Sequence, residues 1–584
     1  MAHNLVELLE FHSNIRDGLQ LGDYTDRLAE WMCKNTFTKG QNWTFKDHEF
    51  QELVVKQKKR ELGVQKCSQV GITEVEIRRM IGFLCLNIGS TAIYTLPTRQ
   101  EAMKFAKGRV DPVIDGSNYL KAKMKTGADG SELKQIDSSF VYFGGAQDTS
   151  QAISVPADYV VQDEIDFSNP DALSAYESRI RHSDFKIRRQ FSTPTVSGYG
   201  ISQLLAGSTQ GRYSVKCSKC NKELFINFFQ DVVIPGFQDR FEKFEKQDLV
   251  DHRYRWKDAY LACPGCKEPI DKDLADPSRR RWVEAYPDRD VAGLYIKPHD
   301  CMRYNATSHV IQQIKGYSTK QNYVNFVHGE TYESDENQVN IGTVLQNTDV
   351  DFQSAGEGTY MGIDVGKKIY VTITKPNGRR RDIVAMMTVQ SSANSAEDLY
   401  DIFVRYGCYR VVMDAGPDWT LALLMLSKIG RFFHPCVYVK ENEKKPGDFT
   451  IKEDDNNIVL AYRTTCLDKL VSDINRGIVH YPKCEEMTKV REHYGGMKRV
   501  DQKDEHGRMV GTWVKISDMD HYFHSHLYSW IACEIDDPEV IVTPDVSVSN
   551  ILGAKMSDGN SSIILGTSVK DALLAAGISF TGRR

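Results

Sequence analysis

The chain has 584 residues, of which 41% are hydrophobic and 26% are charged. These proportions exclude a largely disordered chain, and the length favours about three or four folding units. The formal net charge of −5 excludes a uniformly basic surface, but a local basic stripe would still allow nucleic-acid binding.

Signals for membrane insertion and secretion are missing from the sequence. No apolar run reaches the ~18 residues that a transmembrane helix requires, so we expect no membrane association. The first residues carry Glu7 and Glu10 and have no apolar core, which argues against a signal peptide. The 13 cysteines are an odd number and are mostly scattered singly, which favours a reducing intracellular compartment.

The pattern of apolar residues predicts a chain of several parts. Apolar residues at helical spacing begin the chain, and strand-like runs then alternate with helical patterns, as in a domain with a largely parallel sheet. A Cys-rich, charged insertion and a polar linker precede a second α/β unit and a Ser/Gly/Asp-rich tail. The predicted boundaries are 1–40 for the helical segment, 41–334 for the first α/β domain with the insertion at 211–300, 335–357 for the linker, 358–535 for the second unit and 536–584 for the tail.

Residues 62–73 read LGVQKCSQVGIT and precede an amphipathic helical run. A strand, a tight loop and a helix N-terminus form an anion site, because free backbone N–H groups and the helix dipole face the phosphates. Gly71 and Thr73 match the late glycine and the metal-binding hydroxyl of a phosphate-binding loop. Ile72 stands where that pattern has lysine, so we assign the phosphate contact to Lys66. Taken alone, the segment is also compatible with a purely structural turn.

An apolar strand, YVVQDE, ends on two adjacent acids about 90 residues later. We predict that Asp163 holds Mg²⁺ and that Glu164 orients and deprotonates the attacking water. Gln51, ahead of the first core strand, is a candidate for contacting adenine. Ser192 and Thr193 lie in the segment FSTPT, where ATP-driven motors place a polar loop that senses the γ-phosphate. A cap or a turn is the alternative for each of these last two segments.

Two CxxC pairs occur in the insertion and are separated by 42 residues (262 − 220). Each pair turns tightly enough for two thiolates to meet one metal, and four thiolates close a tetrahedral Zn²⁺ site. With no open position left, the predicted role is structural. The ligands are Cys217, Cys220, Cys263 and Cys266.

Three acids in the second half follow the order strand, strand, helix. Asp364 lies in GIDVG, Asp414 ends the apolar run VVMD, and Asp520 opens the helical run DHYFHSHLYSWIACE. This order is typical of ribonuclease H-like nucleases, in which three carboxylates hold two Mg²⁺ or Mn²⁺ ions that activate water. We also expect the basic residues Lys367, Lys368 and 379–381 to steer a phosphate backbone towards the metals.

These motifs together resemble the large terminase subunit of tailed bacteriophages. The loop KCSQVGITE, then YTLPTRQEA, YVVQDEID and FSTPT are most similar to the lambda-like family, whose phosphate loop also carries its lysine early. GIDVG, VVMDAG and the DHYFH helix are similar to the motifs of the packaging nuclease. The resemblance covers about residues 40–535 in the correct order, and implies a P-loop-type ATPase domain with a zinc-ribbon insertion followed by a ribonuclease H-like nuclease domain.

The resemblance also implies activities and partners. It implies ATP-driven translocation of double-stranded DNA into the procapsid and metal-dependent cleavage of the concatemeric genome. The implied partners are the portal protein, the small terminase subunit and further copies of the chain in a ring, in the host cytoplasm and not in the mature virion. It makes Arg179 and Arg181, in the segment SRIR, candidates for an arginine finger.

Two alternatives stay open at this point. A helicase-like DNA-repair ATPase with a zinc ribbon would need a second ATPase core, whereas residues 358–535 carry the acids instead. A DNA-binding zinc protein, or a transposase-like nuclease with an inactive nucleotide fold, would hydrolyse no ATP.

Overall fold

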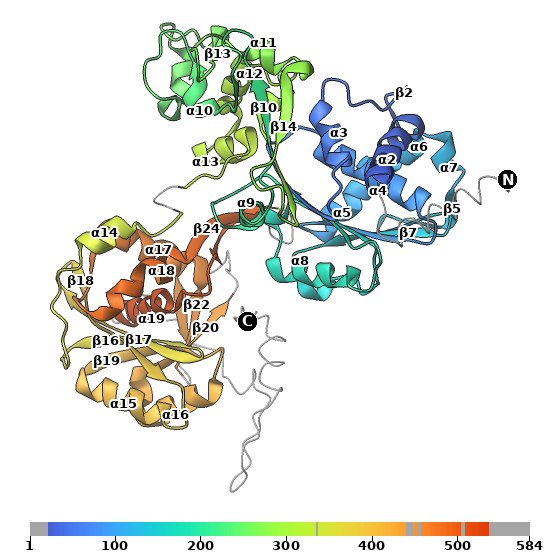
Figure 1. Ribbon diagram of the computed structural model, residues 1–584. Coiled ribbons are helices and arrows are strands. Elements are labelled where there is room, and N and C mark those ends of the chain that lie inside the picture. The colour runs from blue at the N-terminus through green and yellow to red at the C-terminus, as the bar shows by residue number, and fades with distance from the viewer. Residues whose placement is uncertain (1–20, 334–336, 440–447, 453–456, 504–507, 536–584) are drawn as a thin grey trace. The chain divides into compact units, whose positions relative to one another are not determined.

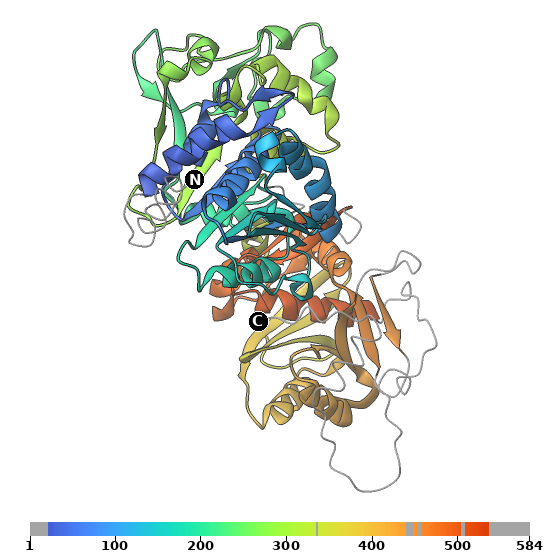
Figure 2. The same cartoon turned by 90° about the vertical axis from the view of Figure 1, so that its right-hand side faces the viewer.

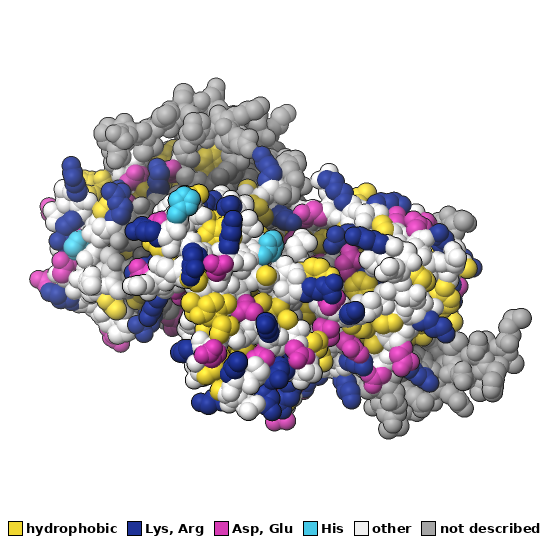
Figure 3. Space-filling model, turned by 90° about the horizontal axis from the view of Figure 1, so that it is seen from above, with side chains coloured by type: hydrophobic (Ala, Val, Ile, Leu, Met, Phe, Trp, Pro, Cys, Tyr) yellow, Lys and Arg dark blue, Asp and Glu magenta, His cyan; other side chains and the backbone are white. Residues whose placement is uncertain are grey.

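The computed structural model describes residues 21–333, 337–439, 448–452, 457–503 and 508–535 (Figure 1). The chain divides into two compact units, of which unit 1 contains residues 1–333 and 501–510, and unit 2 contains residues 334–500 and 511–584. The helical pattern predicted before residue 21 and the tail predicted from residue 536 lie outside the described residues. Within the described ranges, no helix is long and apolar enough to cross a membrane. Lysines, arginines and acidic side chains are mixed over the face in Figure 3.

Unit 1 is built on an eight-stranded sheet. Six neighbouring strands are parallel, and two antiparallel strands extend one edge. Parallel strands need crossover connections, which accounts for the alternation of strand and helix patterns in the sequence. From one edge to the other the strands are β15 (Ala292–Ile296), β3 (Glu61–Lys66), β9 (Ile187–Ser192), β8 (Tyr159–Asp163), β4 (Thr91–Leu96), β7 (Ser139–Gly145), β6 (Leu133–Ile136) and β5 (Met124–Asp129).

Helices cover both faces of this sheet. One apolar core lies beneath α4 and includes Leu62, Val64 and Val161, whereas the smaller core beneath α8 and α9 includes Val160 and Leu205. Adjacent residues Val160 and Val161 point into different cores because successive strand side chains alternate between faces. The helices are α2 (Leu21–Asn35), α3 (Glu49–Val55), α4 (Ile72–Leu86), α5 (Arg99–Phe105), α6 (Asp111–Asp115), α7 (Asn118–Lys121), α8 (Pro170–Glu177) and α9 (Gly200–Ala206), and a short hairpin joins β1 (Phe37–Thr38) and β2 (Gln41–Asn42).

The insertion in unit 1 has a small core of its own. That core joins Cys217 and Cys263 to Val310, Ile311 and Tyr323, so the packed region continues past residue 300. Only short elements form, as expected where a polar and charged sequence offers few periodic apolar runs. They are β10 (Arg212–Lys216), β11 (Glu223–Leu224), α10 (Phe228–Asp231), β12 (Val232–Val233), β13 (Tyr260–Leu261), α11 (Asp271–Leu274), β14 (Arg280–Val283), α12 (Thr307–Gln312) and α13 (Lys320–Asn322).

Unit 2 contains a second eight-stranded sheet, which is mixed. Strands β16, β17 and β18 form an antiparallel meander, while β19, β20 and β22 continue from β16 in parallel. In order across the sheet the strands are β21 (Phe449–Lys452), β22 (Ile458–Tyr462), β20 (Phe433–Val439), β19 (Cys408–Asp414), β16 (Thr359–Val365), β17 (Lys368–Asn377), β18 (Arg380–Gln390) and β23 (Val479–His480).

The helices of unit 2 lie in two layers with the sheet between them (Figures 1 and 2). One apolar core contains residues of α15 and α16, and the other contains residues of α17, α18 and α19. The predicted linker 335–357 carries α14, whose Val344 is buried in the second core, so this segment contributes to folding. The helices are α14 (Ile341–Gln346), α15 (Ser395–Arg405), α16 (Trp419–Ile429), α17 (Arg463–Asn475), α18 (Val490–Gly495) and α19 (His521–Ile535). A separate hairpin joins β24 (Met497–Lys503) and β25 (Met509–Lys515), and its residues 501–510 belong to unit 1.

Helix α19 crosses strand β16 at Gly362. A Cβ atom at this position would lie 2.0 Å from the carbonyl oxygen of Ser525 and 2.1 Å from the backbone nitrogen of Ser529. Only glycine therefore allows the helix to come this close to the strand. Gly362 and Asp364 point to the same face because they are two residues apart in a strand, so this packing also directs Asp364 towards α19.

Candidate functional site

The predicted phosphate loop connects the end of β3 to the start of α4. Gly71 caps the helix with φ = 76°, in the left-handed region that favours glycine. The amide Nε2 of Gln51 donates to the carbonyl of Val70 at 2.9 Å, and a Cβ on Gly71 would lie only 2.6 Å from that nitrogen. Gln51 therefore supports the loop from α3. This contact uses its amide nitrogen for the loop, whereas the sequence suggested a contact with adenine.

Asp163 lies at the end of β8 and is almost fully buried, at 3% exposed. One carboxylate oxygen accepts from Thr73 Oγ1 and from the Tyr94 hydroxyl, each at 2.9 Å. The other oxygen is buried and has no hydrogen-bond donor among the described residues. Burial raises the pKa of Asp163 to about 6, although the positive charge of Lys66 opposes that shift. The site thus joins the predicted lysine, hydroxyl and carboxylate, and sequence reasoning missed Tyr94.

Glu164 adopts a left-handed backbone conformation with φ = 57°, directly after the strand. Its carboxylate lies 3.1 Å from Lys503 Nζ, and the same ammonium group lies 2.7 Å from Glu101. Burial alone would lower the pKa of Lys503, but Glu164 and Glu101 raise it above its usual value. Lys503, which belongs to unit 1, was not predicted from the sequence.

Ser192 ends β9 and Thr193 follows it, and β9 lies between β3 and β8 in the sheet. Ser192 and Thr193 are therefore next to both the phosphate loop and the acids. Asp166 anchors this segment, because its carboxylate accepts from Thr195 N at 2.9 Å, Thr195 Oγ1 at 3.0 Å and Ile201 N at 2.8 Å. Burial raises the pKa of Asp166 to about 7, against the effect of these hydrogen bonds.

Arg179 and Arg181 do not reach the phosphate loop within this chain. The carbonyl of Arg179 accepts from Ala157 N at 3.1 Å, just before β8 begins, while Asp163 ends that strand. A strand of five residues spans about 16 Å. Arg181 is exposed in the same region. An intramolecular finger from these arginines is therefore inconsistent with the fold, because they follow the opposite end of the strand.

The four predicted cysteines come together in unit 1. Their sulfur atoms all lie within 4.8 Å of one another, and the pairs Cys217–Cys266 and Cys220–Cys263 are each separated by 3.8 Å. Tetrahedral zinc with Zn–S bonds of about 2.3 Å separates its sulfur ligands by about 3.8 Å. Among the described residues this is the one cluster of His, Cys, Asp and Glu that meets the geometry of a metal site.

The three acids of unit 2 are gathered at one end of its sheet. Strands β16 and β19 are parallel neighbours with Ile363 opposite Met413, so Asp364 and Asp414 follow at adjacent positions. Both acids point to the α19 face, because Ile363 and Met413, which directly precede them, belong to the core on the opposite face and side chains alternate along a strand. Asp520 immediately precedes α19 and is 1% exposed. Packing of α19 on β16 thus brings the third acid to the same face.

Side chains near Asp520 complete this second site. His521 Nδ1 lies 2.8 Å from Asp364, and its ring stacks on Tyr370 with centroids 4.6 Å apart. His524 Nε2 lies 3.5 Å from Asp520, and Lys515 Nζ lies 3.8 Å from the other oxygen of that carboxylate. The pair Asp520-His521 is itself a sequence signal for His521, whereas no pattern points to Lys515.

The basic residues of unit 2 divide into two groups. Lys367 and Lys368 are exposed in the turn after Asp364. Residues 379–381 lie at the other end of β17, where Arg381 is opposite Pro376 while Tyr370 is opposite Asp364. Arg381 also pairs with Glu534, and Arg380 with Asp382. The expected steering role for 379–381 is therefore wrong, because these residues are remote from the acids and largely neutralised.

Comparison with known families bears on the first site. Residues 44–282 match the family model described as phage terminase large subunit gpA, ATPase domain. Through these residues the chain carries the ATPase domain of a phage terminase large subunit. This family acts in phage DNA packaging, and the match does not favour a helicase-like DNA-repair protein. No curated protein matches the chain.

Solved structures of large terminases are distantly similar to this chain. The large terminase of bacteriophage HK97 is 9% identical, with 87% of this chain and 99% of that chain covered and a TM-score of 0.48. A mutant ATPase domain from Thermus phage P74-26 is 12% identical over 49% and 94% of the chains, with a TM-score of 0.30. The magnesium-bound nuclease of phage G20c is 15% identical over 31% and 84%, with a TM-score of 0.22.

Asp166→Ala tests the anchoring of the Ser192–Thr195 segment. The change leaves two buried backbone N–H groups without an acceptor, so we expect a loss of about 3 kcal/mol in the stability of unit 1. Thermal unfolding followed by fluorescence measures it, with Asp184→Ala, an exposed aspartate, as the control. If both variants unfold at the parent temperature, Asp166 does not anchor the segment.

Proposed function

We propose that the chain is the motor and nuclease of phage DNA packaging, with ATP hydrolysis in unit 1 driving double-stranded DNA into the procapsid. The observation that carries the motor is the hydrogen bond between Thr73 and Asp163, which joins the phosphate loop to the acid at the end of β8. The position of β9 between those two strands adds a third element to the same edge. The carboxyl ends of parallel strands are the usual place for ligand sites in such sheets.

Each residue at this edge has a distinct role in the proposed reaction. Bound Mg²⁺ would supply charge neutralisation at the β- and γ-phosphates, and Thr73 and Asp163 would hold it through one hydroxyl and one carboxylate. Lys66 places a positive charge beside the phosphates. Glu164 accepts a proton from the attacking water once its carboxylate is free of Lys503.

A second proposal concerns the loop after β9. Ser192 and Thr193 lie between the phosphate loop and the acids, so loss of the γ-phosphate changes the contacts open to them. Thr195 carries that change onwards, because its carbonyl accepts from Asn325 Nδ2 at 2.8 Å and from Tyr332 N at 3.0 Å. The segment is therefore suited to couple hydrolysis to movement.

Unit 2 is proposed to be a ribonuclease H-like nuclease. Three antiparallel strands followed by two parallel ones give the order β18, β17, β16, β19, β20, with acids on β16 and β19. Asp364, Asp414 and Asp520 would hold two Mg²⁺ or Mn²⁺ ions, which supply an activated water and stabilise the leaving oxygen. The donors are hard carboxylate oxygens, which these cations prefer. His521 orients Asp364, and Lys367 and Lys368 offer positive charge to the phosphate backbone.

The remaining proposals concern zinc and partners. Cys217, Cys220, Cys263 and Cys266 are proposed to hold one structural Zn²⁺, supported by their sulfur separations. The portal protein, the small terminase subunit and a ring of identical chains are the proposed partners, in the host cytoplasm. In such a ring Arg179 and Arg181, which do not reach the site of their own chain, are candidates for a finger acting on a neighbour.

Glu164→Gln tests the proposed base. The amide cannot accept the proton, while Lys66, Thr73 and Asp163 stay in place, so ATP turnover should fall by about 100-fold or more and nucleotide binding should persist. Steady-state phosphate release and binding of a fluorescent ATP analogue measure the two effects. Glu132→Gln, on the surface of the same unit, should keep the parent rate. Turnover by Glu164→Gln at the parent rate would show that another group is the base.

Metal analysis of the purified chain tests the cysteine site. We expect one zinc per chain in the parent protein, and less in Cys266→Ser with a lower unfolding temperature, because metal binding there contributes folding energy. Cys33→Ser removes a half-buried cysteine outside the cluster and should keep the zinc. A parent protein with no zinc would refute the proposal.

Asp364→Asn tests the nuclease. The change keeps the side-chain shape but removes one metal-binding charge, so Mn²⁺-dependent plasmid cutting should fall by about 100-fold or more. ATP hydrolysis should continue, because its residues belong to unit 1. Asp398→Asn, an exposed acid on α15, is the matched control. Undiminished cutting by Asp364→Asn would exclude the proposed site.

A further inference from the structure

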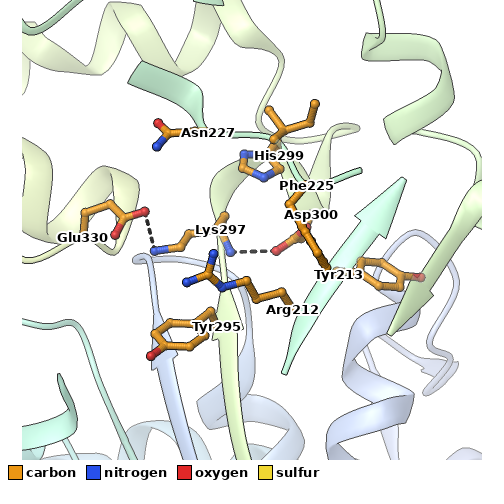
Figure 4. Close-up of a pocket in the computed structure, with 10 residues that line it drawn as sticks. Arg212, Tyr213, Phe225, Asn227, Tyr295, Lys297, His299, Asp300 and Glu330 are labelled. Carbon is orange, nitrogen blue, oxygen red and sulfur yellow. Dashed lines mark hydrogen bonds and ion pairs between the residues drawn. The ribbon is translucent and has the colours of Figure 1, made fainter. Parts of the chain in front are cut away.

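A cavity of about 320 Å³ in unit 1 lies outside both sites described above (Figure 4). It is bounded by the start of the cysteine insertion and by the residues that follow the edge strand β15. Its size is at the lower end of the range for small-molecule sites. The polar groups that line it are Arg212, Asn227, Lys297, His299, Asp300 and Glu330.

The charges around the cavity leave one positive charge unbalanced. Lys297 Nζ lies 2.7 Å from Glu330, and Asp300 lies 2.5 Å from the buried guanidinium of Arg280. Within each of these two ion pairs the opposite charges balance. Arg212 forms no ion pair with any described residue, and its guanidinium lies over the ring of Tyr295 at 5.2 Å. An occupant with a single negative charge would therefore match the lining.

His299 provides an unused polar group in the same wall. It is 6% exposed, and its Nδ1 atom is buried with no hydrogen-bond partner in the described part of the chain. Burial lowers the pKa of His299 to about 4, so the ring is neutral near pH 7 and has one donor and one acceptor nitrogen. In Figure 4 the His299 ring, the Asn227 amide and the head groups of Arg212 and Lys297 face the same space.

Aromatic surface lies next to these polar groups. Phe225 is 44% exposed at the cavity, and Tyr213 and Tyr295 are partly exposed. Exposed rings beside a cation suit a ligand that has a phosphate next to a sugar or a base. A free nucleotide carries at least two negative charges, whereas a phosphate within a nucleic-acid strand carries one.

We infer that this cavity binds one phosphodiester group of the DNA substrate, with Arg212 as the main cation and the adjoining sugar or base against Phe225 and Tyr295. This inference rests on the proposed function, which makes DNA the substrate. It adds a contact point in the insertion of unit 1.

The cavity is connected to the phosphate loop through Gly329. The carbonyl of Gly329 accepts from Lys297 Nζ and from Gln65 Nε2, each at 2.9 Å. Gly329 has φ = 61°, and a Cβ there would lie 2.6 Å from the backbone nitrogen of Cys67, directly after Lys66. A phosphodiester that attracts Lys297 weakens this hold on Gly329. DNA in the cavity would thereby alter the support of the phosphate loop, and with it the rate of ATP hydrolysis.

Binding of duplex DNA by the full chain, followed by fluorescence anisotropy over a range of salt concentrations, tests the inference. Arg212→Ala should lower the slope of log affinity against log salt by about 0.9 and weaken binding by about eightfold at 0.1 M salt, the loss of one phosphate contact. The change in the rate of ATP hydrolysis that DNA causes in the parent should shrink, while hydrolysis without DNA is unchanged. Arg212→Lys keeps the charge and should retain the parent slope. A parent-like slope in this variant would show that misfolding does not cause the loss in Arg212→Ala.

Arg281→Ala is the matched control, because this arginine lies on β14 beside β10, is exposed and pairs with Glu223. It should leave the slope unchanged. Parent-like binding by Arg212→Ala would overturn the inference while leaving the proposed function intact, whereas a parent chain that binds no DNA would refute the proposed function itself. Equimolar thymidine monophosphate tests for a site that binds free nucleotides. If it displaced the DNA from the parent but not from Arg212→Ala, such a site would be shown and the inference would also be overturned.

Discussion

Burial of the Asp163 carboxylate is the constraint on which the ATPase site depends. A carboxylate at 3% exposure needs donors or cations around it, because burial penalises its charged form. Thr73 and Tyr94 supply two donors to one oxygen, and Lys66 supplies a nearby charge. The second oxygen has no donor among the described residues, so the protein alone does not complete the site. A cation bound with a nucleotide would complete it.

The two sheets place their acids by the same physical rule. Carboxyl ends of parallel neighbours meet at one edge, so Asp163 reaches the phosphate loop, and Asp364 reaches Asp414. What differs is the third component. In unit 1 a loop supplies it, whereas in unit 2 it is a helix, which approaches closely because Gly362 has no side chain. Small backbone features thus decide whether acids far apart in sequence become one site.

Much of this organisation was predictable because the signals are local. The strand–loop–helix pattern located Lys66, Gly71 and Thr73, and the two CxxC pairs located four sulfurs that the fold brings within 4.8 Å. In both cases residues close together in the sequence were enough for the prediction. The order of the acids also predicted that Asp364 and Asp414 would be neighbours on parallel strands, as the register shows, while a metal site formed with Asp520 stays a prediction.

Other features depended on contacts that no local pattern encodes. Lys503 meets Glu164 from 339 residues away, and Tyr94 reaches Asp163 from a different strand. The backbone position of Arg179, beside the start of β8 and not beside Asp163 at its end, was likewise not readable from the segment SRIR. The steering role given to residues 379–381 failed for a similar reason, since the long β17–β18 hairpin carries them away from Asp364.

The Mg²⁺ dependence of nucleotide affinity tests the central claim most directly. ADP binding to the full chain, measured by calorimetry with and without Mg²⁺, should be strengthened by the cation in the parent protein. In Asp163→Asn the account predicts that ADP still binds through Lys66 and the loop, but that Mg²⁺ no longer strengthens it, because the carboxylate that holds the ion is gone. An equal Mg²⁺ effect in the parent and in Asp163→Asn would contradict the account.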